Sequence, residues 1–64
     1  SINMYKAYEL IKLRNKYFNR VHLLSKEELA QIIILFSDVD YYYIYGTDVI
    51  FLDECRNRLS EYSR

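Results

Sequence analysis

The segment formed by residues 25–43 constrains the fold of this chain more than any other. It begins with Ser25, which is followed three residues later by Glu28, the capping-box pattern of a helix start. Apolar side chains then recur at alternating spacings of three and four residues, as in helices that pack in bundles. This apolar seam consists of Leu29, Ile32, Phe36, Val39 and Tyr43. We therefore expect a helix at about 26–45.

A second amphipathic helix is expected at about 4–22. On a helix, one face of this segment gathers apolar side chains: Met4, Ala7, Leu10, Ile11, Tyr17, Phe18 and Val21. Arg14 falls within that face, where an unpaired buried charge costs several kcal/mol. We expect its guanidinium either to reach solvent at the rim or to form an ion pair with an acid of the helix at 26–45 or of a partner chain.

Gly46 is the single glycine of the chain and there is no proline. In a helical interpretation, Gly46 ends the helix at 26–45 in the left-handed conformation that glycine adopts most easily. Thr47 or Asp48 then caps a third helix at about 48–62. The buried stripe of that helix is expected to contain Leu52, Cys55, Leu59 and Tyr62.

An alternative α+β fold places a β-hairpin at 41–52. Residues 41–45 and 48–52 are rich in residues that favour strands, and Gly46 and Thr47 suit a tight turn. An isolated two-stranded hairpin is marginal unless it packs on something. Because the apolar seam continues to Tyr43 without a break, we favour the all-α fold of three helices built on an antiparallel helical hairpin.

The length of 64 residues allows one small domain, 1–64, in which residues 1–3 precede Met4 as a candidate native start. A core of this size is marginal without a disulfide, a metal or oligomerisation. Cys55 is the single cysteine, and 52% of residues are hydrophobic, so we expect a homo-oligomer. A lone cysteine is typical of the cytoplasm. The apolar runs are too short for a membrane span. High Tyr and Ile content is typical of AT-rich genomes such as those of phages or viruses.

The formal net charge is zero, but residues 1–22 carry +4 and residues 23–53 carry −5. This order suits two antiparallel helices that attract each other. Lys12, Lys16 and Arg20 recur every fourth residue and could contact phosphates. Nucleic-acid binding usually comes with a net basic domain. A small DNA-binding transcriptional regulator that uses this basic face is therefore our alternative function.

No pattern of residues indicates catalysis, a metal or a cofactor. Asp38 and Asp40 begin like a calcium loop, but the later positions of that loop are not filled. His22 is the single histidine, and no base is identifiable beside Cys55. A chain this small is also not expected to enclose a substrate pocket of several hundred Å³. We therefore expect that the protein is not an enzyme.

The outer side of the helix expected at 26–45 carries apolar and tyrosine side chains that the seam does not use. Tyrosine is enriched at protein interfaces. This side is our candidate partner-binding surface and consists of Ile34, Leu35, Asp38, Tyr41, Tyr42 and Tyr45.

The sequences LSKEELA at 24–30 and FSDVD at 36–40 resemble the central segment of the small haemolysin-expression-modulating family of enteric bacteria. The spacing between the two is three residues longer here, and tyrosines replace the polar run expected after Asp40. Members of that family are all-helical cytoplasmic proteins that act on transcription by binding a nucleoid protein. The resemblance implies a helical, protein-binding regulator.

Together these patterns predict a small cytoplasmic protein-protein interaction module. We expect it to act as a homodimer, as a regulator, an inhibitor or an assembly factor that binds another protein.

Overall fold

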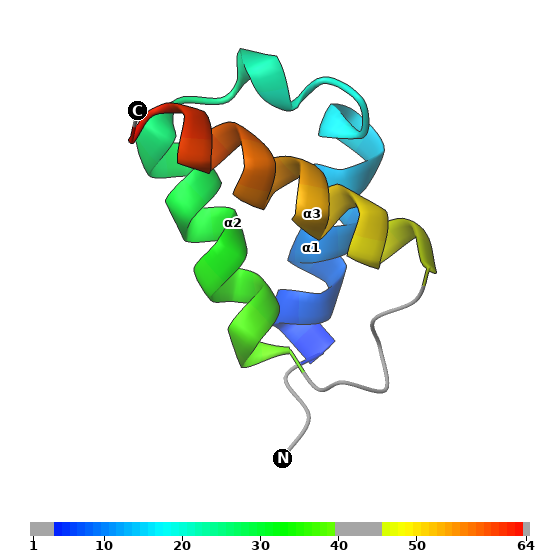
Figure 1. Ribbon diagram of the computed structural model, residues 1–64. Helices are drawn as coiled ribbons and strands as arrows, with labels where there is room; N and C mark the ends of the chain where they lie inside the picture. The colour runs from blue at the N-terminus through cyan, green and yellow to red at the C-terminus, as the bar shows by residue number, and fades with distance from the viewer. Residues whose placement is uncertain (1–3, 40–45, 64) are drawn as a thin grey trace.

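The computed structural model describes residues 4–39 and 46–63. These residues form three α-helices and one short 3-10 helix: α1 (Met4–Tyr17), η1 (Val21–Leu23), α2 (Lys26–Asp38) and α3 (Gly46–Glu61). Helix α3 lies across the other two helices (Figure 1) and packs more extensively on α2 than on α1. The described part of the chain contains no strand. The predicted all-helical class is thus confirmed for these residues.

Helix α2 begins with the predicted capping box. The backbone amide of Glu28 donates to Ser25 Oγ at 3.1 Å, and the amide of Ser25 donates to Glu28 Oε1 at 2.8 Å. Both amides lie at the helix start, where no intrahelical acceptor is available to them. The reciprocal pair therefore fixes Lys26 as the first helical residue.

Helix α2 ends at Asp38, so the prediction that it extends to residue 45 is wrong at Val39. The backbone of Val39 is extended, with φ −91° and ψ 139°. In the last turn, the hydroxyl of Ser37 donates to the carbonyl oxygen of Ile34 at 2.7 Å. Such local side-chain bonds compete with helix continuation. Residues 40–45, which include Tyr43, lie outside the described residues.

Helix α1 ends at Tyr17, so the prediction of a helix to residue 22 is also wrong. Asn19 adopts the left-handed conformation with φ 61°, which asparagine tolerates better than most residues. The amide of Asn19 donates to Glu54 Oε1 of α3 at 3.2 Å. The chain then turns through η1 and reaches the start of α2.

Helix α3 begins at Gly46, two residues earlier than predicted. Gly46 has no positive φ, so the left-handed role assigned to it is wrong. Residues 46–52 are helical, which rules out the strand at 48–52 that the β-hairpin alternative requires. Asp48 lies in the first turn but is buried, so it is not an exposed cap.

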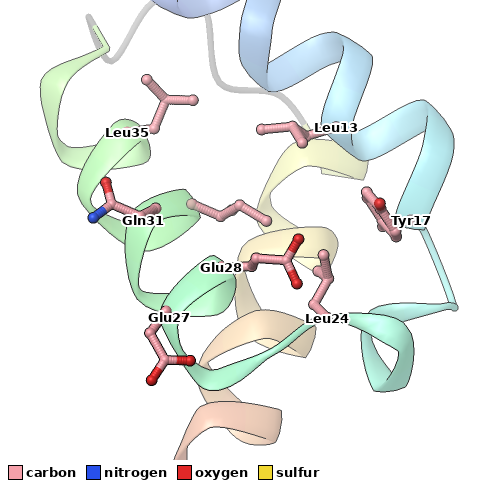
Figure 2. A pocket seen from close by; sticks show the side chains of 8 residues that line it. Leu13, Tyr17, Leu24, Glu27, Glu28, Gln31 and Leu35 are labelled. Carbon is pink, nitrogen blue, oxygen red and sulfur yellow. The ribbon is translucent and has the colours of Figure 1, made fainter.

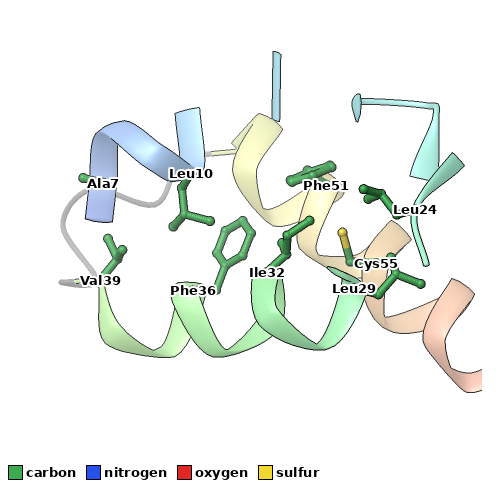
Figure 3. Packing of buried hydrophobic residues seen from close by; sticks show 9 residues of the cluster. All are labelled: Ala7, Leu10, Leu24, Leu29, Ile32, Phe36, Val39, Phe51 and Cys55. Atoms are coloured by element: carbon green, nitrogen blue, oxygen red, sulfur yellow. The ribbon is translucent and has the colours of Figure 1, made fainter. Parts of the chain in front are cut away.

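The core contains side chains from all three α-helices and from Leu24 and Val39, which lie just before and just after α2 (Figure 3). The apolar seam is confirmed as far as it is described, because four of its residues are buried. Phe51 was not predicted, yet it is fully buried with Cys55 and lies 6.2 Å from Phe36 between ring centroids. Tyr62 is exposed, so its predicted place in the stripe of α3 is wrong. The buried set is Ala7, Leu10, Leu24, Leu29, Ile32, Phe36, Val39, Phe51 and Cys55.

An ion pair joins the last turn of α1 to the start of α3. Arg14 Nη1 lies 2.6 Å from Asp48 Oδ1, and the two side chains are only 23% and 8% exposed. Of the two alternatives considered for Arg14, the structure shows the ion pair, but the acid belongs to the third helix rather than to the second or to a partner chain. A more exposed pair between Lys6 and Asp38, at 2.8 Å, links the start of α1 to the end of α2.

Removing Arg14 should destabilise the fold far more than removing Lys6. Arg14→Ala leaves the buried carboxylate of Asp48 without its guanidinium, and we expect a loss of about 2–4 kcal/mol in the free energy of unfolding. Lys6→Ala removes an exposed pair and should cost less than about 1 kcal/mol. Urea unfolding followed by circular dichroism measures both. Equal losses in the two variants would contradict this ranking.

Candidate functional site

An open groove lies between the second half of α1 and the part of α2 that runs from Glu27 to Leu35 (Figure 2). Its volume is about 380 Å³. The groove is open to solvent, so the expectation that so small a chain does not enclose a substrate pocket of several hundred Å³ stays a prediction. The groove is lined by Leu13, Tyr17, Leu24, Glu27, Glu28, Gln31, Ile32 and Leu35.

The groove follows from the way α1 is attached to the other helices. The start of α1 is held to the end of α2 by the ion pair of Lys6 with Asp38. The later part of α1 is held to α3 instead, by Arg14 through Asp48 and by the amide of Asn19 through Glu54. Helices α1 and α2 therefore meet directly at one end, and the groove opens between them at the other.

The groove has an apolar base and a polar mouth. Leu24 and Ile32 are buried, whereas Leu13, Tyr17 and Leu35 are half-buried along the walls. The polar lining side chains are Glu27, Glu28 and Gln31, which are all exposed and all belong to α2. An open apolar groove of this kind suits a surface that another molecule covers.

Two carboxylates give the α2 side of the mouth its charge. The hydrogen bonds that Glu28 makes with Ser25, and the charge of Lys16, lower the pKa of Glu28 below its ordinary value. Glu28 is therefore ionised at neutral pH. The ammonium of Lys16 lies 5.4 Å from the centroid of the Tyr17 ring, on the α1 side. The mouth thus has an acidic edge on α2, and Lys16, which is not part of the lining, is a basic neighbour on the α1 side.

Of the six predicted partner-binding residues, the structure describes Ile34, Leu35 and Asp38. Leu35 lines the groove, whereas the neighbouring Ile34 is 53% exposed and is not part of its lining. Asp38 is paired with Lys6. Tyr41, Tyr42 and Tyr45 lie outside the described residues. Binding by this set stays a prediction, and the groove itself was not anticipated.

The predicted basic stripe is not continuous on one helix. Lys12 and Lys16 are exposed on α1, but Arg20 lies beyond the end of that helix, just before η1. Lys12 Nζ also lies 3.4 Å from Glu9 Oε1. Contact of these residues with DNA stays a prediction.

Within residues 4–39 and 46–63, no three histidine, cysteine, aspartate or glutamate side chains are grouped so that they could hold a metal ion. His22 is exposed on η1. None of the described helices has both the length and the apolar character that crossing a membrane requires.

Comparisons of the chain with protein-family models, curated proteins and solved structures find no match. The resemblance of residues 24–40 to the haemolysin-expression-modulating family thus has no support from a family model, and the partner that it implies is not carried over. The geometry of the groove is therefore the basis of the function proposed below.

The thiol of Cys55 should be unreactive in the folded protein. Burial, with a smaller contribution from the charge of Glu54, raises the pKa of Cys55 to about 12. A free thiol has a pKa of about 8.5, and the thiolate is the form that reacts. Raising the pH from about 7 to about 9 should therefore strongly accelerate maleimide labelling of the urea-unfolded chain. The same change should leave labelling of the folded chain slow.

The raised pKa also affects stability, because the unfolded thiol ionises before the folded one. The contribution of Cys55 is complete below about pH 8.5 and is lost as the pH rises toward the folded pKa of about 12. Native labelling that accelerates with pH as fast as the unfolded control would show an accessible thiol and contradict the buried position of Cys55.

Proposed function

We propose that this protein is a small non-enzymatic module that binds another protein through the groove between α1 and α2. The observation that carries the proposal is the open groove of about 380 Å³, whose base and walls are apolar. Removal of apolar surface from water is the main favourable contribution to most protein–protein association. A regulator, an inhibitor or an assembly factor would act in this way.

The polar groups of the groove favour a protein partner over a small molecule. Small-molecule sites usually hold a few polar groups that converge on the ligand. Here Glu27, Glu28 and Gln31 lie along one edge and are exposed. A polar rim around an apolar centre is the usual anatomy of a protein interface.

The burial and the raised pKa of the Cys55 thiol support the non-enzymatic part of the proposal. Nucleophilic catalysis by cysteine requires the thiolate. Cys55 is buried, and its raised pKa keeps the thiol protonated at neutral pH. The thiol is therefore poorly suited to attack a substrate.

Substitution of Leu35 should weaken partner binding, and the neighbouring Ile34 provides the control. Leu35→Asn places a polar amide in the groove wall, whereas Ile34→Asn makes the same type of change outside it. Peptides selected from a random displayed library on the wild-type protein should lose at least about tenfold in affinity with Leu35→Asn, a loss of about 1.4 kcal/mol. They should lose less than about twofold with Ile34→Asn.

Circular dichroism of both variants verifies that they remain folded. The proposal is contradicted if the library yields no binders. It is also contradicted if the selected peptides are insensitive to Leu35→Asn or depend more strongly on Ile34, which would favour the outer face of α2.

The proposal includes self-association through α1. Tyr5, Tyr8 and Ile11 recur every third residue and are 73%, 57% and 38% exposed. Sedimentation equilibrium should give twice the chain mass of 7.9 kDa for the wild type. Tyr8→Glu should shift the mass toward one chain, because it adds charge to the covered surface. A wild-type mass of one chain at every concentration contradicts self-association.

A further inference from the structure

The two edges of the groove differ in charge. On α2, the lining side chains at the mouth include the carboxylates of Glu27 and Glu28. On α1, the lining side chains are Leu13 and Tyr17, and the ammonium of Lys16, which is not part of the lining, lies 5.4 Å from the centroid of the Tyr17 ring. A bound segment would therefore meet negative charge along one flank and positive charge along the other.

The shape of the groove favours a helical occupant. Its α2 wall runs from Glu27 to Leu35, about 12 Å at the rise of an α-helix, which is slightly more than two turns. Both long walls are helices, and the described residues offer no strand edge to which an extended peptide could add. Docking of an amphipathic helix into an apolar groove is the recognition mode that uses such walls.

We propose that the occupant is an amphipathic helix of a partner protein, with an apolar stripe in the groove and basic side chains on the flank that faces Glu27. This inference rests on the proposed function of the groove. Apolar anchors at positions i, i+3 or i+4, and i+7 fill the space above Ile32 and Leu24. The basic flank lies along α2, because Lys16 opposes it on the α1 side.

Glu27 is the residue whose substitution tests whether the charge of the partner is positive. Its carboxylate is exposed and makes no ion pair within the described residues. Glu28 is less suitable for the test, because its side chain completes the capping box with Ser25 and its removal would disturb the start of α2. Asp53 of α3 is exposed and lies outside the groove lining, so Asp53→Asn is a matched control for the charge change of Glu27→Gln.

Three synthetic amphipathic peptides of about sixteen residues, long enough to span the groove, provide the probe. They share one leucine stripe and differ only in their polar flanks, which carry Lys, Gln or Glu. Fluorescence anisotropy at low salt and at about 0.15 M salt gives their affinities. We expect the Lys peptide to bind about fivefold tighter than the Glu peptide at low salt, as for one or two exposed ion pairs.

Glu27→Gln should reduce this preference by at least half, and Asp53→Asn should leave it unchanged. If all three peptides bind equally and their binding is sensitive to Leu35→Asn, the groove remains a protein-binding site. The inference that the partner carries a basic flank would then be overturned. A preference for the Glu peptide would overturn it as well. Failure of all three peptides to bind, the uncharged Gln peptide included, would count against both the helical occupant and the proposed function.

Discussion

The ion pair between Arg14 and Asp48 determines where α1 lies on the rest of the molecule. The two charges are largely removed from water, and their pairing offsets a desolvation cost of several kcal/mol. This pairing leaves α1 little freedom to move away from α3. The groove lies where α1, held to α3 at Arg14, diverges from α2 between Glu27 and Leu35.

Helix α2 forms the other wall of the groove, and its first turn contains both the capping box and the carboxylates that line the mouth. The carboxylate of Glu28 accepts a hydrogen bond from the backbone amide of Ser25 and also lines the mouth of the groove. Glu28 therefore stabilises the start of α2 as well as making the mouth of the groove acidic. Glu27, one residue earlier, has no such bond in the described residues and is available to a partner. At the apolar base of the groove, Ile32 likewise belongs both to the core and to the groove lining.

The sequence predicted the parts of the fold that depend on local chemistry. The capping box at Ser25 and the apolar spacing from Leu29 to Val39 are local patterns, and both are confirmed. The requirement that Arg14 find an acid follows from the cost of an unpaired buried charge. The identity of that acid did not follow, because Asp48 was interpreted as a helix cap.

That interpretation also explains why Phe51 was missed. Asp48, Phe51 and Cys55 share one face of α3, at spacings of three and four residues, and an acid in the first position hid the pattern. Asn19 was the available signal for the end of α1, since asparagine is the commonest substitute for glycine in the left-handed position. The groove depends on how far two helices diverge, which is a tertiary property that periodicity does not encode.

A double-mutant cycle on Arg14 and Asp48 tests the anchoring of α1 most directly. It compares the free energies of unfolding of the wild type, Arg14→Ala, Asp48→Ala and the double variant. The account predicts a coupling energy of about 2 kcal/mol between the two side chains. A coupling energy below about 0.5 kcal/mol would contradict it, because α1 would then be held on α3 without this pair.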